Sequence, residues 1–113
     1  MIDREEILRR LTLGDVTCLE AVAAERGTRP RGASLDHIGE ALVKLGALMA
    51  TDGSDLTWQL TVRTALDAGL TPDEIVDALV VLAPVIGRTR VVDDAPRLAL
   101  AVGYDVTAAL ENR

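Results

Sequence analysis

Apolar residues recur along this chain at the spacing of an α-helix, so that most segments have one apolar and one polar side. No segment keeps the strict alternation of apolar and polar residues that is typical of a half-buried strand. The pattern predicts helices over about residues 3–11, 15–25, 36–50, 54–68, 72–83 and 88–102, and a last turn near 106–111. We therefore expect an all-α fold, a compact helical bundle of about six to seven helices.

The sharpest helix start is TPDEI, residues 71–75. Thr71 is expected to cap the helix, Pro72 to take its first position and Glu74 to close a capping box. Pro84 is expected either to bend or to end that helix, because proline lacks the backbone N–H that the helix needs. Pro96 predicts a bend or a restart in the last helical region for the same reason.

The stretch RGTRPRGAS, residues 26–34, is the one long irregular connection in the pattern. It separates an N-terminal helical arm and loop, residues 1–33, from the main body, residues 34–113. The total of 113 residues is the length of a single domain. We expect one domain that carries an N-terminal arm.

The helix predicted at 72–83 is apolar on nearly every side. Its apolar residues are Ile75, Val76, Ala78, Leu79, Val80, Val81 and Leu82. A helix that is apolar all round must be covered all round, and a chain this short offers few layers to cover it. The pattern therefore predicts a homo-oligomer in which a neighbouring subunit supplies part of the cover.

Composition excludes several classes of protein. The formal net charge is −6, which argues against nucleic acid or an anionic membrane as the main partner. A single cysteine, Cys18, excludes an intrachain disulfide, and its apolar neighbours favour a core or interface residue over a reactive thiol. The N-terminus MIDREEILRR is too charged for a signal peptide, and the longest apolar stretch, 78–87, is too short to span a membrane. We expect a cytoplasmic protein.

Three hydroxyls share one face of the helix predicted at 54–68. Ser54, Thr57 and Thr61 fall at i, i+3 and i+7, and Trp58 and Gln59 lie beside them. One interpretation is that Ser54 caps the helix while the threonines bond back to carbonyls. The other is that the hydroxyls, with Trp58 and Gln59, line a pocket for a neutral or carboxylate ligand.

The segment LDHIGEALVKLGALMATDGSDLTWQLTVRTALDAGLTPDEIVDALVVLAPVIG, residues 35–87, resembles the carboxymuconolactone decarboxylase family, which includes the alkylhydroperoxidase D-like proteins. The most specific part is VRTALDAGLTPDEIVDAL, residues 62–79, a helix end, a glycine and a capped helix start in the family's order. The resemblance implies an all-helical protein that assembles as a trimer or hexamer, with sites near subunit interfaces.

The peroxidase branch of that family carries Cys-x-x-Cys-x-x-x-His at the start of a helix and a glutamate one helix earlier. Counted back from Gly69, the two cysteine positions fall on Ser54 and Thr57, and the histidine position on Thr61. The glutamate position falls on Ala41, with Glu40 one residue away. Peroxide reduction needs a thiolate and a second, resolving thiol, so this chain resembles the scaffold without its redox chemistry.

Candidate catalytic residues are His37, Glu40 and Thr61. His37 is the only histidine, and imidazole is the side chain best suited to proton transfer near neutral pH. Glu40 lies one helical turn later on the same face, so the two could pair, although both could equally be exposed first-turn residues. Candidate substrate-binding residues are Ser54, Thr57, Trp58, Gln59, Arg63 and Arg88, the arginines because a guanidinium binds a carboxylate through two hydrogen bonds.

Neither a metal nor a cofactor is expected. The adjacent carboxylates of Asp93 and Asp94 point apart on a helix and do not form a metal site. Two hypotheses remain open. One is a non-redox decarboxylase or isomerase that acts on a small carboxylate, and the other is a non-catalytic binding or accessory protein with a vestigial pocket.

Overall fold

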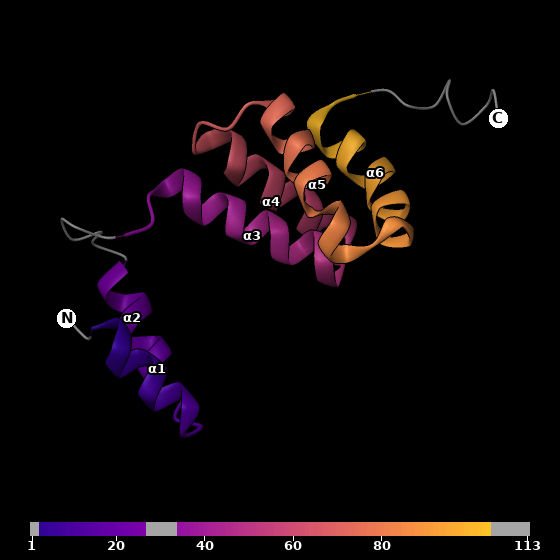
Figure 1. Ribbon diagram of the computed structural model, residues 1–113. Helices are drawn as coiled ribbons and strands as arrows, with labels where there is room; N and C mark the ends of the chain where they lie inside the picture. Colours follow the sequence, from indigo (N-terminus) through magenta and orange to yellow (C-terminus); the bar gives the residue numbers. More distant parts are fainter. Residues whose placement is uncertain (1–2, 27–33, 105–113) are drawn as a thin grey trace. The chain divides into compact units, whose positions relative to one another are not determined.

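The computed structural model describes residues 3–26 and 34–104, and the fold it shows in these ranges is entirely helical (Figure 1). Its helices are α1 (Arg4–Thr12), α2 (Cys18–Arg26), α3 (His37–Thr51), α4 (Asp55–Asp67), α5 (Pro72–Ile86) and α6 (Arg88–Val102). The prediction of an all-α fold is confirmed. The last turn expected near 106–111 lies outside the described residues.

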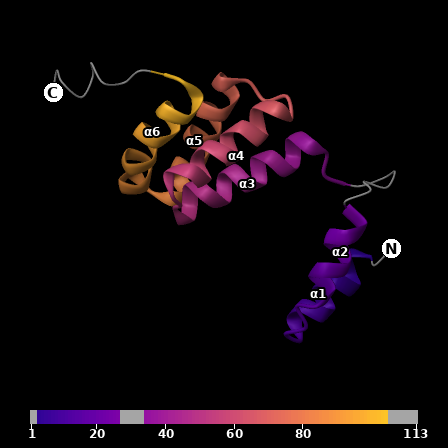
Figure 2. The ribbon, with the colours of Figure 1, turned by 180° about the vertical axis from the view of Figure 1, so that it is seen from behind.

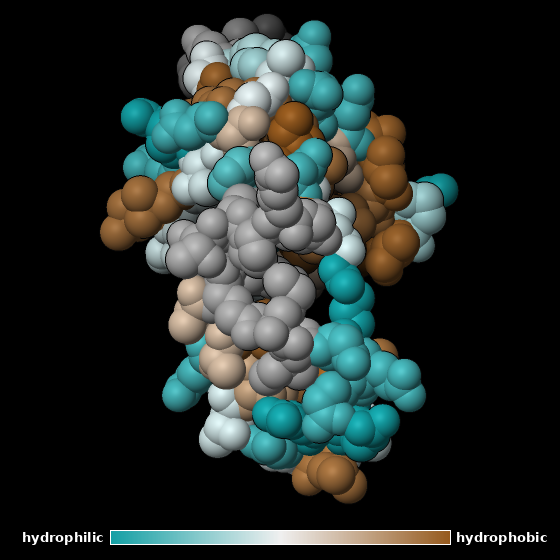
Figure 3. All heavy atoms as spheres, turned by 90° about the vertical axis from the view of Figure 1, so that its left-hand side faces the viewer, coloured by the Kyte–Doolittle hydropathy of each residue, from teal (hydrophilic) through white to brown (hydrophobic). Residues whose placement is uncertain are grey.

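The chain divides into two compact units, Met1–Ser34 and Leu35–Arg113. The first contains α1 and α2, and the second contains α3 to α6. Apolar side chains reach the surface in each unit (Figure 3). None of the helices that the structure describes is both long enough and apolar enough to cross a bilayer.

In the second unit, α3 packs against α4 and α5, and α6 packs against the same two helices (Figures 1 and 2). The side chains between them form one apolar core. Its largest fully buried apolar members are Trp58, Leu45, Met49, Ile75 and Val62. These residues come from α3, α4 and α5, and Leu98 of α6 belongs to the same core, so all four helices of the unit share it.

Local signals set the helix starts. The capping box at α5 is present as predicted, with the Glu74 N–H donating to Thr71 Oγ1 at 3.1 Å and the Thr71 N–H donating to Glu74 Oε1 at 2.9 Å. Asp36 caps α3 and accepts from the Gly39 N–H at 2.7 Å. Each cap satisfies a backbone donor that the first turn of a helix leaves free.

The two internal prolines end no helix. α5 runs through Pro84 to Ile86, and α6 runs through Pro96 to Val102. Pro84 deprives the carbonyl of Val80 of its usual donor, but Val80 is 64% exposed, so this turn lies on the solvent side where water can bond the carbonyl. The expected end of α5 near residue 83 was therefore three residues too early.

The first unit is organised by local contacts. Asp3 caps α1 by accepting from the Glu6 N–H at 2.8 Å, and Glu6 pairs with Arg9 and, at 2.9 Å, with Arg10. α2 begins three residues later than predicted, because Asp15 Oδ1 accepts from both the N–H and the hydroxyl of Thr17 and holds a turn there. Those hydrogen bonds also lower the pKa of the Asp15 carboxyl.

Candidate functional site

A cleft of about 410 Å³ lies between α3 and α4. α3 lines it with His37, Glu40, Ala41 and Lys44. Thr64 and Asp67 line it from α4, together with Ala68 at the C-cap of that helix. Asp36 caps α3, so His37 takes the first helical position and Glu40 follows one turn later on the same face. The structure therefore brings together two of the three predicted catalytic residues.

The α3–α4 cleft has the groups that an acid–base site for an anion needs. It combines the imidazole of His37, the carboxylates of Glu40 and Asp67, and the ammonium of Lys44. Ala41, which is buried, lines the cleft at the position where the family resemblance places a glutamate. The hydroxyl of Thr64 donates to the Leu60 carbonyl at 2.9 Å, which uses its proton within α4.

The hydroxyl stripe lies elsewhere. Ser54 caps α4 by accepting from the Thr57 N–H at 3.2 Å, and its Oγ lies 3.0 Å from Thr57 Oγ1. Both side chains are exposed. Thr61 is half-buried and does not line the α3–α4 cleft. The stripe therefore does not converge on His37 within one chain.

Trp58 and Gln59 line a different cleft, of about 200 Å³, between α4 and α6. Its other lining residues are Asp55, Pro96, Arg97, Leu100 and Ala101. Trp58 is 1% exposed and is the largest fully buried side chain of the core, whereas Gln59 is exposed. The indole Nε1 of Trp58 has no hydrogen-bond partner, which is unusual for a buried donor.

The predicted arginines line neither cleft. Arg63 and Arg88 are both exposed. The arginine that the α4–α6 cleft does contain is Arg97, whose Nη1 donates to Asp52 Oδ1 at 2.5 Å and to the Gly53 carbonyl at 2.9 Å. Sequence reasoning missed Arg97 because nothing in its local pattern shows that α6 reaches the connection between α3 and α4.

Asp94 on α6 was also missed. It is 1% exposed, and its Oδ2 atom has no hydrogen-bond partner. Burial raises the pKa of its carboxyl, Asp52 and Asp93 raise it further, and Arg90 and Arg97 oppose the rise. A signal was present in the sequence, because Asp94 falls between Val91 and Leu98 on the apolar stripe of its helix.

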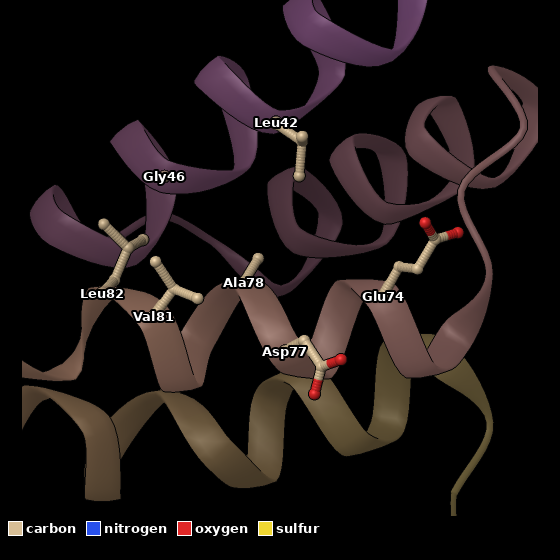
Figure 4. Close-up of a pocket in the computed structure, with 7 residues that line it drawn as sticks. All are labelled: Leu42, Gly46, Glu74, Asp77, Ala78, Val81 and Leu82. Carbon is tan, nitrogen blue, oxygen red and sulfur yellow. The ribbon is translucent and has the colours of Figure 1, made fainter.

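A third hollow, of about 400 Å³, is a groove between α3 and α5 (Figure 4). Leu42 points into it from α3, and Ala78, Val81 and Leu82 point into it from α5. Glu74 and Asp77 are its only charged residues. The lining suits an apolar partner better than a polar substrate.

Within the described part of the chain, no group of three or more His, Cys, Asp or Glu residues could hold a metal ion. Cys18 is buried, and its thiol donates to the Asp15 carbonyl at 3.5 Å. The carboxylates of Asp93 and Asp94 do point apart, since Asp93 is exposed and Asp94 is buried.

Comparison with known proteins gives one match. The model of the carboxymuconolactone decarboxylase family matches residues 17–101, from the turn before α2 almost to the end of α6. No curated protein and no solved structure matches the chain. The family match extends beyond the resemblance seen over residues 35–87 and in LALAVGYDV, residues 98–106, because it takes in α2 and the first part of α6.

Proposed function

The chain belongs to the carboxymuconolactone decarboxylase family, and from that premise we propose that it is a non-redox member acting on a small carboxylate. The reaction is a decarboxylation or an isomerisation in the α3–α4 cleft, in the cytoplasm. The observation that carries the proposal is the meeting of His37, Glu40 and Lys44 in that one cleft. Both reactions move a proton to or from carbon, which is a task that an imidazole can perform.

Three residues of the cleft have distinct roles in this proposal. Lys44 binds the substrate carboxylate as a point charge, since lysine presents three donors on a flexible stem. His37 transfers the proton. Glu40, one turn from His37, orients the imidazole.

Peroxidase activity is not part of the proposal. Ser54 and Thr57 occupy the positions where the resemblance places the two thiols, and a hydroxyl forms neither a sulfenic acid nor a disulfide. Cys18 is buried, away from solvent peroxide. We expect no peroxide reduction with any thiol donor and no change in activity on Cys18→Ser. Peroxide turnover that disappears in the Cys18→Ser variant would show this view of the family site to be wrong.

We also propose that the protein works as a homo-oligomer, a trimer or hexamer. The α3–α5 groove supports this, because Val81 at its edge is 74% exposed and Val80 and Val85 on the same helix are exposed as well. Val81→Asp is expected to shift the molecular mass in light scattering toward the monomer, while Val92→Asp on α6 serves as the control. A stable wild-type monomer at micromolar concentration contradicts the proposal.

The only histidine supplies the test of the α3–α4 cleft. Its ring protons give one set of NMR signals, which can be followed while small mono- and dicarboxylates are added one at a time. A carboxylate that binds beside His37 shifts these signals. Lys44→Gln is expected to weaken that binding by about tenfold, which corresponds to about 1.4 kcal/mol, and Arg88→Gln is expected to leave it unchanged. Equal losses in both variants contradict the assignment of Lys44.

A non-catalytic binding or accessory protein is the second candidate. It is favoured by the two hydroxyls at the positions where the resemblance places reactive groups, because Ser54 and Thr57 bond to each other and Ser54 caps α4. The variant His37→Asn separates the two candidates. In an enzyme it removes turnover of a bound carboxylate while binding persists, and in a binding protein there is no turnover to remove.

A further inference from the structure

Arg97 fastens the connection between α3 and α4 onto α6. One guanidinium nitrogen, Nη1, donates both to Asp52 Oδ1, at 2.5 Å, and to the Gly53 carbonyl, at 2.9 Å. Asp52 ends α3, and Ser54, two residues later, caps α4. The contact therefore holds the segment from which α4 begins, and we call it the Arg97 clamp.

The clamp is weak and the segment it holds is strained. The side chains of Arg97 and Asp52 are 41% and 50% exposed, and ion pairs at that exposure contribute little because water screens them. Asp52 has a φ of +88°, the left-handed region that side chains other than glycine rarely adopt. Such strain persists only while surrounding contacts hold it in place.

Asp94 lies three residues before Arg97 on the same helix, a spacing at which two side chains are neighbours. It is buried, and its Oδ2 atom has no hydrogen-bond partner. An ionised carboxylate there would be a buried charge without a paired donor, which is far more costly than a neutral carboxyl. The ionised form would therefore attract a cation, and the two cations that act on it from α6 are Arg90 and Arg97. Of these, Arg97 is the one that bonds Asp52.

We propose that Asp94 and Asp52 compete for Arg97, so that ionisation of Asp94 opens the Arg97 clamp and frees the start of α4. With Asp94 neutral, Arg97 bonds Asp52 and Gly53, as observed. With Asp94 ionised, Arg97 turns back along α6 to pair with it, because attraction between charges is stronger in the buried site than at the surface. The connection then loses its contact with α6.

Burial sets the direction of the pH dependence, and the charged groups around Asp94 adjust its midpoint. On α6 these are Arg90, Asp93 and Arg97, and at the end of α3 there is Asp52. On α4, Asp55 lines the neighbouring α4–α6 cleft. The acidic residues of α5 lie in its first two turns. One of them, Asp73, accepts from the hydroxyl of Tyr104, which follows the C-terminal end of α6.

Since burial raises the pKa of Asp94, its neutral form persists to a higher pH than that of an ordinary aspartate. The clamp is therefore closed at low pH and opens as the pH rises through the raised pKa. The same linkage applies to stability. The contribution of Asp94 is complete below its unfolded-state pKa and is lost as the pH rises through its folded-state pKa.

The fluorescence of Trp58 can report the opening of the Arg97 clamp without an added label. Trp58 is the only tryptophan, it is buried, and it lines the α4–α6 cleft together with Arg97. Its fluorescence, measured on the full chain from about pH 4 to about pH 9, is expected to show one transition. Asp94→Asn, which has nearly the same shape and cannot ionise, is expected to lose the transition. Asp93→Asn, at the exposed neighbour, is the matched control and is expected to keep it.

A second variant tests the competition itself. Asp52→Asn removes the rival carboxylate, so Arg97 is free to pair with Asp94 and the midpoint is expected to move to lower pH. A charge effect alone would also lower the midpoint, because Asp52 raises the pKa of Asp94. The two are separated in an Arg97→Gln background, where a carboxyl ¹³C NMR titration of Asp94 is expected to show a smaller shift on Asp52→Asn. This measurement still decides the question if Asp94→Asn fails to fold.

Hydrogen exchange locates the movement. Above the midpoint, the amides of residues 52–58 are expected to exchange faster in the wild type than in Asp94→Asn, with no such difference below it. The proposal is overturned if the wild type shows no transition, if Asp94→Asn retains it or if Asp93→Asn abolishes it. It is also overturned if the Asp52→Asn midpoint stays or rises, or if the shift is equally large in the Arg97→Gln background. It is also overturned if exchange in residues 52–58 does not follow the fluorescence.

Discussion

The α1–α2 pair and the α3–α6 unit are both helical, but they differ in what their helices bury. α1 has no buried residue, and in α2 the buried apolar residue among those described is Cys18. In the second unit every helix contributes at least two buried residues, among them Trp58, Met49 and Ile75. Helices of about nine to fifteen residues are marginal in isolation, so each unit needs stabilising contacts beyond its backbone hydrogen bonds. Because the two units bury different numbers of side chains, these contacts differ in kind.

Local electrostatic contacts dominate the interactions that are visible in the first unit. Asp3 caps α1, and Glu6 pairs with Arg9 and Arg10 within the same helix. Such contacts favour helix formation but contribute little each, because solvent and salt screen them. In the second unit, burial of apolar side chains contributes more to the free energy of unfolding than these contacts do. Two units with similar secondary structure can therefore lose very different amounts of stability when a side chain is substituted.

The largest expected effect comes from truncating one apolar side chain in each unit. Ile75→Ala removes a fully buried side chain and is expected to cost about 2–5 kcal/mol of unfolding free energy. Leu8→Ala, at an exposed position of α1, is expected to cost about 0.5 kcal/mol or less. Urea denaturation of both variants measures the difference. Equal losses would mean that Leu8 is covered by something outside the described contacts.

Two glycines extend the comparison to the backbone. A Cβ at Gly53 would lie 2.8 Å from Leu48 Cδ1, so Gly53→Ala is expected to cost about 1–3 kcal/mol through overpacking. A Cβ at Gly14, in the first unit, meets nothing within 4 Å, and the strain comes only from its φ of +82°. Gly14→Ala is therefore expected to cost about 1 kcal/mol. Thermal melting of the two variants in parallel checks the order, and a larger loss at Gly14 contradicts it.

The N-terminal caps of α5 and α1 allow the same kind of hydrogen bond to be removed in each unit and the loss of stability to be compared. Thr71→Ala breaks the capping box of α5 and is expected to lower the stability of the core by about 0.5–2 kcal/mol. Asp3→Ala removes the cap of α1 and is expected to lower the helix signal in circular dichroism while the main unfolding transition stays in place. A shift of that transition in Asp3→Ala would show that α1 is coupled to the core.

The same contrast explains what could be predicted from the sequence. The helices and the capping box at Thr71 were predictable, because they depend on residues within a few positions of each other. The end of α5 was placed too early, near residue 83, since the tolerance of α5 for Pro84 depends on which side of the turn faces water. That information lies in the packing of α5 and not in its own sequence.

The sites show this limit more sharply. His37 and Glu40 could be placed on one face because they lie three residues apart in one helix. Asp67, which lines the same cleft from α4, could not be identified, because its position depends on how α3 and α4 pack. Arg97 and Asp94 were not identified for a related reason. The Arg97 clamp joins residues 45 positions apart, and the burial of Asp94 depends on the helices packed around it.

The smallest expected effect concerns Thr57, which lies in the second unit but relies on local contacts like those of the first. Its hydroxyl lies 3.0 Å from Ser54 Oγ and is exposed, while the cap of α4 uses the Thr57 backbone N–H and not its side chain. Thr57→Val keeps the shape and leaves the cap intact, so stability is expected to change by about 0.5 kcal/mol or less. Binding of a carboxylate in the α3–α4 cleft is expected to stay the same, because Thr57 does not line it. The checks are thermal melting and the His37 NMR titration, with Ser54→Ala as the partner variant that does remove the cap. If Thr57→Val weakens binding while melting is unchanged, the hydroxyl contacts the ligand, and the site is completed by a neighbouring subunit instead of one chain.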